Sequence, residues 1–194
     1  MTKKKMKNIA AALIAASLVL ALSACNFSAP RSSGTSDEDP GEESYQEIVS
    51  SESGAVFTFP EDWKTSDGND VASINVEAPA NDVAFLLVEE PTSDFVADTT
   101  DVYYGDLVSE NFSSTLDPTT MELSEWEQVY AGKANLPAVR REIKGTIDKK
   151  KATMIITIVR TEAYFYQMVQ ASGASDLSYA LPVFDDILKT ADFK

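Results

Sequence analysis

The chain has 194 residues, and its 31 acidic against 16 basic side chains give a formal net charge of −15 at pH 7. Such an acidic chain is not expected to bind nucleic acid, whose phosphates attract basic surfaces. It contains no histidine and a single cysteine, Cys25, which excludes an imidazole base, an imidazole metal ligand and a disulfide within the chain.

The first 24 residues have the pattern of an export signal. Lys3, Lys4, Lys5 and Lys7 precede an almost uncharged stretch over residues 9–22, as a basic n-region precedes a short apolar core. At about 1.5 Å per residue, this core is too short to cross a hydrocarbon layer of about 30 Å as an untilted helix. We therefore expect residues 1–24 to be cleaved from the mature protein.

The signal ends in Leu22-Ser23-Ala24-Cys25, which resembles the lipobox of bacterial lipoproteins. In that family the cysteine sulfur receives a diacylglycerol, and the cysteine becomes the first residue of the mature chain. Two acyl chains are enough for stable membrane attachment. The resemblance implies lipidation of Cys25 and an extracytoplasmic, membrane-anchored location, with the choice of inner or outer membrane left open. The alternative is an ordinary secretory signal that happens to contain a cysteine.

Residues 25–44 are predicted to be a disordered linker that begins at the lipidated cysteine. The segment is rich in Ser, Gly, Pro and acidic residues and has few large apolar side chains, so it cannot bury enough surface to offset the entropy of ordering. Its r.m.s. reach is about 25 Å. Residues 45–194 are the length of one domain and are expected to form it.

The first half of this domain is predicted to contain three strands and a helix. A β-branched and aromatic run begins at Val56 and stops at Pro60, and the alternation of Ala72, Ile74 and Val76 with polar residues marks a second strand. Residues 83–88 are apolar throughout, as in a central strand covered on both faces. Apolar residues at helical spacing then predict a helix over 101–116, capped by Asp98, Thr99 or Thr100.

The second half is predicted to be a meander followed by a helix. Strands are expected over 123–131, 138–147, 152–161 and 163–171, paired as antiparallel hairpins. An apolar stripe from Leu177 to Leu188 predicts a C-terminal helix, with Ser175 as a candidate cap and Pro182 either kinking it or marking its first turn. The fold class is therefore α+β, one antiparallel sheet with its two helices packed on it.

By its order of elements, the domain resembles the PsbP-like superfamily. The residues that carry the resemblance are Phe57-Thr58-Phe59-Pro60-Glu61-Asp62-Trp63, Leu136-Pro137-Ala138-Val139-Arg140, Ala163-Tyr164-Phe165-Tyr166-Gln167 and Phe184-Asp185-Asp186-Ile187-Leu188-Lys189. The resemblance implies an α/β/α sandwich and a binding or assembly role without catalysis. It supplies no catalytic residues to transfer.

Four residues are candidates for ligand or partner binding: Arg140, Arg141, Tyr164 and Tyr166. The two tyrosines share one side of the last strand and form either core or a wall for a peptide or hydrophobic ligand. Arg141 alternates with Val139 and Ile143, so its guanidinium either lies along the sheet with a carboxylate partner or reaches past an edge toward a ligand. We favour a third interpretation, a surface arginine whose stem lies on the sheet and whose guanidinium reaches solvent.

Basic residues are concentrated between positions 133 and 160, where Glu142 and Asp148 are the only acids. We interpret the cluster as solvated strand faces and a hairpin tip, since surface charge mostly serves solubility. The alternative is a docking patch for an anionic partner or lipid headgroup. The cluster consists of Lys133, Arg140, Arg141, Lys144, Lys149, Lys150, Lys151 and Arg160.

Carboxylates are the remaining route to catalysis or metal binding. Glu89 and Glu90 exemplify adjacent acidic pairs, but neighbours on a strand point to opposite faces. Residues 67–70, Asp-Gly-Asn-Asp, could hold calcium but lack the spacing of an EF-hand and fit an ordinary turn. We expect no metal and no cofactor.

These patterns together predict a non-enzymatic lipoprotein that acts as a protein-binding or assembly accessory at the cell envelope. Its partners would be the membrane, through the anchor, and a protein. The alternatives are a solute- or lipid-binding lipoprotein with a hydrophobic cleft near Tyr164 and Tyr166, and a carboxylate hydrolase.

Overall fold

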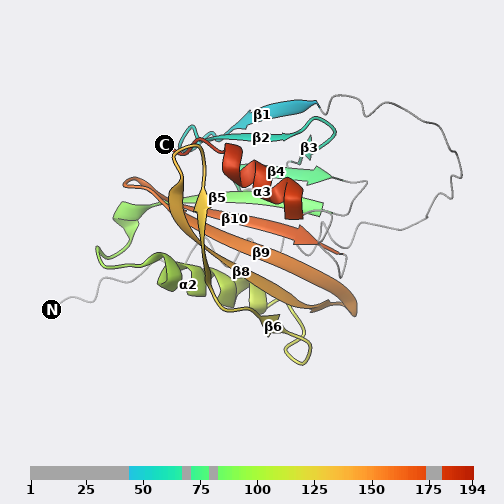
Figure 1. Ribbon diagram of the computed structural model, residues 1–194. Coiled ribbons are helices and arrows are strands. Elements are labelled where there is room, and N and C mark those ends of the chain that lie inside the picture. Colours follow the sequence, from blue (N-terminus) through green and yellow to red (C-terminus); the bar gives the residue numbers. More distant parts are fainter. Residues whose placement is uncertain (1–43, 67–70, 79–82, 174–180) are drawn as a thin grey trace, which may run out of the picture.

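The computed structural model describes residues 44–66, 71–78, 83–173 and 181–194 (Figure 1). The predicted signal, Cys25, nearly all of the predicted linker, the Asp-Gly-Asn-Asp segment and Ser175 lie outside the described residues. The elements are β1 Tyr45–Val49, β2 Val56–Pro60, β3 Lys64–Thr65, β4 Ile74–Ala78, β5 Val83–Pro91, a 3-10 turn Thr92–Asp94, α2 Asp101–Ser113, β6 Glu122–Leu123, β7 Glu127–Ala131, β8 Leu136–Ile147, β9 Lys150–Arg160, β10 Tyr164–Ser172 and α3 Leu181–Thr190.

Within the described part of the chain, eight strands form one antiparallel sheet in the order β3-β4-β5-β10-β9-β8-β6, with β7 also paired to β8. The predicted meander is confirmed, because β8, β9 and β10 follow one another as hairpins. All of residues 83–88 are buried in β5, between β4 and β10. This burial confirms a central strand that is covered on both faces.

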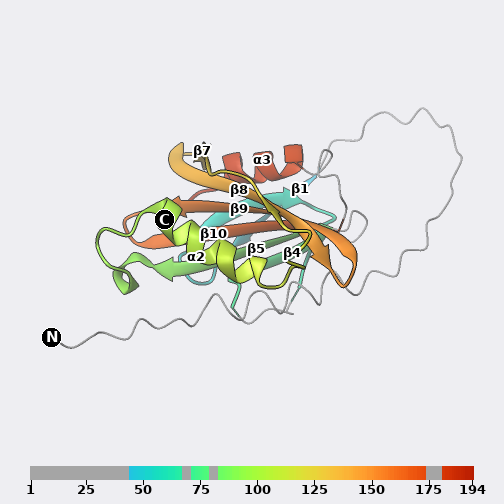
Figure 2. The same cartoon turned by 90° about the horizontal axis from the view of Figure 1, so that it is seen from below.

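Each face of the sheet carries its own hydrophobic cluster. Tyr104, Val108 and Phe112 of α2 pack with Phe165 and Val169 of β10 on one face, here termed the α2 face. Tyr166 and Met168, which alternate with them along β10, pack on the other face with residues of α3, the α3 face. Figure 2 shows the two helices on opposite sides of the sheet.

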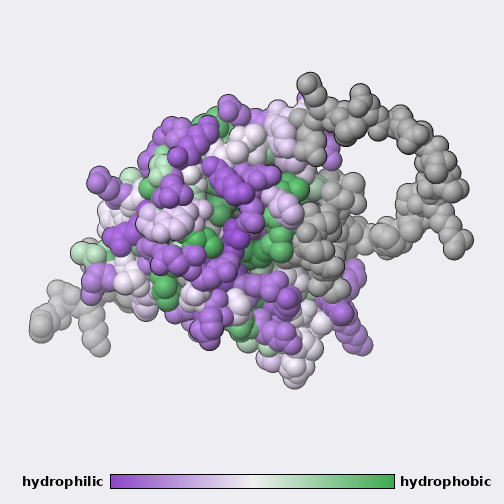
Figure 3. All heavy atoms as spheres, viewed as in Figure 1, coloured by the Kyte–Doolittle hydropathy of each residue, from purple (hydrophilic) through white to green (hydrophobic). Residues whose placement is uncertain are grey.

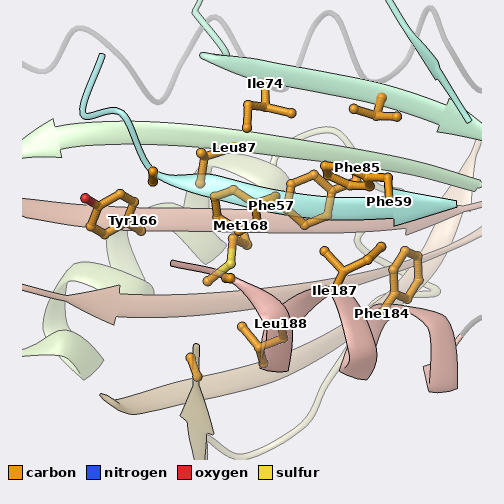
Figure 4. Close-up of a cluster of buried hydrophobic side chains, with 14 of the residues drawn as sticks. Phe57, Phe59, Ile74, Phe85, Leu87, Tyr166, Met168, Phe184, Ile187 and Leu188 are labelled. Atoms are coloured by element: carbon orange, nitrogen blue, oxygen red, sulfur yellow. The ribbon is translucent and has the colours of Figure 1, made fainter. Parts of the chain in front are cut away.

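The layer over the α3 face is mixed rather than purely helical. Phe57 and Phe59 of β2 lie beside Phe85, with Phe59 and Phe85 ring centroids 5.1 Å apart (Figure 4). Phe184, Ile187 and Leu188 of α3 join the same cluster. The β1–β2 hairpin therefore shares with α3 the task of covering this face, which the sequence pattern did not predict.

Two further boundaries differ from the predictions. The strand expected over 123–131 is broken into β6 and β7, because Trp126 between them packs against the α2-face cluster. The helix expected to reach residue 116 ends at Ser113. Pro182 lies in the first turn of α3, where backbone N–H groups have no partner within the helix, so its lack of an N–H costs no helical hydrogen bond.

Candidate functional site

The neighbouring residues Arg140 and Arg141 of β8 point to opposite faces of the sheet. Arg140 Nη2 lies 2.8 Å from Asp185 Oδ1 of α3. Arg141 Nη1 lies 3.1 Å from Asp106 Oδ1 of α2. Both arginine side chains are mostly buried, with 14% and 15% of their side-chain surface exposed. Each guanidinium therefore joins β8 to one of the helices, and the two do not form one site.

Trp126 completes the contact around Arg141. The guanidinium carbon lies 4.4 Å from the indole ring centroid, and the indole N–H donates to the same Asp106 oxygen at 2.8 Å. Gly105 makes this approach possible, since a Cβ there would come within 2.5 Å of the indole. The carboxylate partner that the sequence allowed for Arg141 is therefore present.

The two candidate tyrosines, Tyr164 and Tyr166, lie together on the α3 face, with ring centroids 5.9 Å apart. Tyr166 is fully buried, and its hydroxyl donates to the Lys194 carbonyl at 2.9 Å and accepts from the Lys194 amide at 3.2 Å. Tyr164 is half-buried at the start of β10. Tyr164 is thus the more accessible of the pair, and a binding role for either remains a prediction.

Arg160, at the end of β9, occupies a more accessible position than either predicted arginine. Its Nη1 donates to the Thr99 carbonyl at 2.8 Å, next to Thr100, which caps α2. Its guanidinium carbon lies 5.2 Å from the Phe165 ring centroid. The residue is exposed, so Arg160 links β9, β10 and the start of α2 while keeping contact with solvent.

An open groove of about 500 Å³ adjoins Arg160 and is lined also by Leu136, Thr161 and Glu162. Its walls come from the start of β8 and from the β9–β10 turn. Figures 1 and 2 show that this turn, the β5–α2 segment and the β7–β8 turn lie at the same end of the sheet. The groove is thus part of a surface built from three connections.

Large apolar side chains are exposed at the same end. Val96 is 66% exposed, Val102 40%, Tyr103 51% and Tyr130 60%; with Arg160 they are termed the end surface. Val96, Val102 and Tyr103 flank Thr99 and Thr100 along the chain. Tyr130 of β7 pairs with Pro137 of β8. The next residue of β8, Ala138, pairs with Val159 of β9, so Pro137 lies beside Arg160, and Tyr130 lies one strand further along the sheet.

The α3 face has a different character. Hydrophilic residues dominate it in the space-filling view, and its apolar residues appear in small separate groups (Figure 3). The end surface is therefore the better candidate for a contact with another molecule. Of its members, the sequence analysis named only Arg160, within the basic cluster. Tyr130 also carried a signal, since it is the outward-facing aromatic residue between Val129 and Ala131, which pack inward.

Two pKa shifts accompany this end of the molecule. Burial raises the pKa of the Asp101 carboxyl, and the nearby Arg160 guanidinium partly offsets that rise. Burial, followed by the charge and hydrogen bond of Glu90, raises the pKa of Tyr104 well above its usual value. Tyr104 accordingly stays protonated, and its hydroxyl donates a hydrogen bond to Glu90 Oε2 at 2.5 Å, which gives it a structural role.

The basic cluster does not form one patch. Arg160 belongs to the end surface and Lys133 lies in the nearby β7–β8 turn. Lys149, Lys150 and Lys151 lie at or beside the β8–β9 turn, at the opposite end of β9. Arg140 and Arg141 contact the helices, and Lys144 lies 2.7 Å from Glu142.

The two carboxylates of the Glu89–Glu90 pair are also separated. Glu89 accepts hydrogen bonds from Ser50 and Ser53 on the α3 side, while its neighbour Glu90 accepts one from Tyr104 on the α2 side. Among the described residues, no three acidic side chains are grouped so that they could hold a metal ion. No helix within the described ranges has the length and apolar character needed to span a membrane.

Comparisons of the sequence with protein families and with curated proteins give no match. Solved structures do match. Cyanobacterial PsbP (CyanoP) from Synechocystis sp. PCC 6803 superposes with a TM-score of 0.53 at 11% identity, covering 82% of this chain and 98% of that one. The domain has a PsbP-like fold. LpqN of Mycobacterium tuberculosis, which is involved in cell envelope biogenesis, superposes at 0.55 and 10% identity, covering 79% of this chain and 92% of that one.

Proposed function

We propose that this protein is an extracytoplasmic lipoprotein, anchored to the membrane through Cys25, that acts as a non-catalytic protein-binding or assembly accessory at the cell envelope. The export pattern and the lipobox resemblance support the anchor. The PsbP-like fold supports an α/β/α sandwich, and its likeness to LpqN, a protein of cell envelope biogenesis, is in keeping with an envelope role.

The end surface is the observation that carries this proposal. Tyrosine and arginine are enriched where proteins bind one another, because they combine large contact area with hydrogen bonding. Tyr103 and Tyr130 offer that chemistry at the same end of the sheet as Arg160, which lines a groove that is open rather than enclosed. An open groove suits an inserted side chain of a protein partner, whereas small-molecule sites usually bury most of their ligand.

The groove also supports a second candidate, a solute- or lipid-binding lipoprotein. Leu136 would contact an apolar group, and Arg160 would pair with an anionic one. Tyr164 begins β10 directly after the turn that lines the groove. A thermal-shift screen of anionic metabolites and lipids separates the two functions. A small ligand that binds the groove raises the melting temperature by mass action, whereas a protein that binds only a protein partner shows no shift, because that partner is not in the screen.

Site-specific photo-crosslinking in the envelope tests the protein-binding function. A photoreactive phenylalanine analogue replaces Tyr103 or Tyr130, and Tyr45, which is 53% exposed on β1, serves as the matched control. We expect positions 103 and 130 to crosslink the same protein and position 45 not to. Equal crosslinking from all three positions, or none from 103 and 130, would contradict the proposal.

A further inference from the structure

The β8–β9 hairpin extends beyond the rest of the sheet. Strand β10 ends at Ser172, which pairs with Thr153, and Thr153 also pairs with Lys144 of β8. Three more pairs of β8 and β9 follow, ending with Ile147 and Lys150. At about 3.3 Å per residue, the hairpin projects about 10 Å past its neighbour β10.

The projecting end carries three exposed lysines, Lys149, Lys150 and Lys151, termed here the lysine tip. Asp148 and Lys149 form the turn with φ values of 50° and 68°, as in the tight two-residue turns of hairpins. Lys150 and Lys151 are adjacent on β9 and so point to opposite faces. The charges therefore surround the end of the hairpin and suit a contact made end-on.

Within the described ranges, the lysine tip lacks the ion pairs that neutralise other lysines. Among the described residues, no carboxylate lies within 4.0 Å of these three ammonium groups, whereas Lys189 and Lys194 are paired with Asp186 and Asp192. The tip is a local excess of positive charge on a chain of net charge −15.

The described chain begins at this same end of the sheet. Tyr45 pairs with Pro60, and Gln46 Nε2 donates to the Trp63 carbonyl at 2.7 Å, beside β3. Lys64 of β3 pairs with Glu77, one residue before the end of β4. Figures 1 and 2 both show the start of β1 and the hairpin turn at one end of the molecule.

We propose that the lysine tip contacts the anionic lipid headgroups of the membrane to which the chain is anchored. The inference rests on the proposed anchor at Cys25, which lies 20 positions before Tyr45 along the chain. Lysines near an anionic bilayer are attracted to it within about 8 Å at physiological salt. An anchored domain needs only a weak contact, because the anchor supplies a high local concentration of lipid.

This contact gives the domain an orientation. Strand β9 runs from Lys150 at the tip to Arg160 at the end surface, about 35 Å at about 3.3 Å per residue. With the tip on the bilayer, the end surface faces away from it. The contact would thus present Tyr103, Tyr130 and Arg160 to a partner in the envelope.

The test uses the mature chain attached to vesicles through the thiol of Cys25, the only cysteine. A maleimide lipid provides the attachment, in vesicles of phosphatidylcholine alone or with phosphatidylglycerol. Energy transfer from the protein's tryptophans to a dansyl headgroup lipid reports how closely the domain approaches the surface. We expect phosphatidylglycerol to increase the transfer and high salt to reverse the increase.

Two triple variants with the same net charge make the test specific. K149Q/K150Q/K151Q should abolish the increase caused by phosphatidylglycerol. K133Q/K189Q/K194Q removes three exposed lysines outside the hairpin and should retain it. No increase for the unsubstituted chain, or equal increases for both variants, would overturn the proposal. Because the attachment is chemical, this result is independent of whether cells acylate Cys25.

Discussion

Asp106 illustrates how single residues hold the domain together around the predicted binding residues. One of its carboxylate oxygens accepts from Arg141 at 3.1 Å and from the Trp126 indole at 2.8 Å. The arginine also lies over the indole ring. Three residues from α2, β8 and the β6–β7 connection thus support one another, and Arg141 has a structural task.

Replacement of Arg141 with alanine should lower the free energy of unfolding by about 1–2 kcal/mol, because it removes an ion pair and a cation–π contact together with the packing of the arginine stem. Urea denaturation measures the loss. Lys189→Gln is the control, since Lys189 and Asp186 are 71% and 67% exposed, and it should change stability by less than about 0.5 kcal/mol. Unchanged stability for Arg141→Ala would contradict the structural role of Arg141 and favour a role in ligand binding.

Part of this site could be predicted from residue patterns. The alternation of Arg141 with Val139 and Ile143 allowed a guanidinium along the sheet, which is where it lies. It equally allowed a guanidinium that reaches solvent or a ligand, so the pattern did not choose between these positions. Its partner could not be predicted, because Asp106 is 35 positions away and comes close only when α2 packs on β8. Arg160 was missed as a site residue for a similar reason: its contacts with Thr99 and Phe165 depend on how three elements meet.

At the scale of elements, one carboxylate ties the β1–β2 hairpin to the sheet in addition to the packing of Phe57 and Phe59. The hydroxyls of Ser50 and Ser53, in the connection between β1 and β2, donate to the two oxygens of Glu89 on β5. Ser50 also donates its amide to the Ala55 carbonyl at 2.8 Å. Glu89 thereby fixes the hairpin over the α3-face cluster that Phe57 and Phe59 complete.

Glu89→Gln should loosen this hairpin, because a neutral amide offers one acceptor oxygen where the carboxylate offers two. We expect faster hydrogen exchange at the amides of Tyr45–Val49 and a loss of about 1–2 kcal/mol in the free energy of unfolding. Glu47→Gln, on exposed β1 surface, is the matched control and should leave both quantities nearly unchanged. Equal exchange in the two variants would mean that Glu89 does not hold the hairpin.

The sequence predicted most strands because their side chains alternate or are apolar throughout, as in β4, β5 and β9. Strand β1 escaped prediction because Tyr45 and Val49 point outward, so its apolar residues do not mark one buried side. The break between β6 and β7 was missed because the packing of Trp126 on Gly105 joins residues 21 positions apart. Local periodicity does not record such long-range contacts.

At the scale of the whole molecule, the two ends of the sheet differ in chemistry. One end combines the start of β1 with the lysine tip, and the other combines exposed tyrosines and valines with Arg160. The antiparallel sheet with helices packed on it was predicted from the order of elements, and the likeness to CyanoP supports that fold. The contrast between the ends could not be predicted, because it depends on the register of β8 against β9 and β10.

The proposed attachment to the membrane would give this asymmetry its meaning, so the state of Cys25 tests the account most directly. The measurement is mass spectrometry of the amino-terminal peptide of the protein extracted from its native membrane. The account predicts a mature chain that begins at Cys25 and carries a diacylglycerol on the cysteine sulfur. An unmodified Cys25, or an amino terminus at another residue, would contradict it.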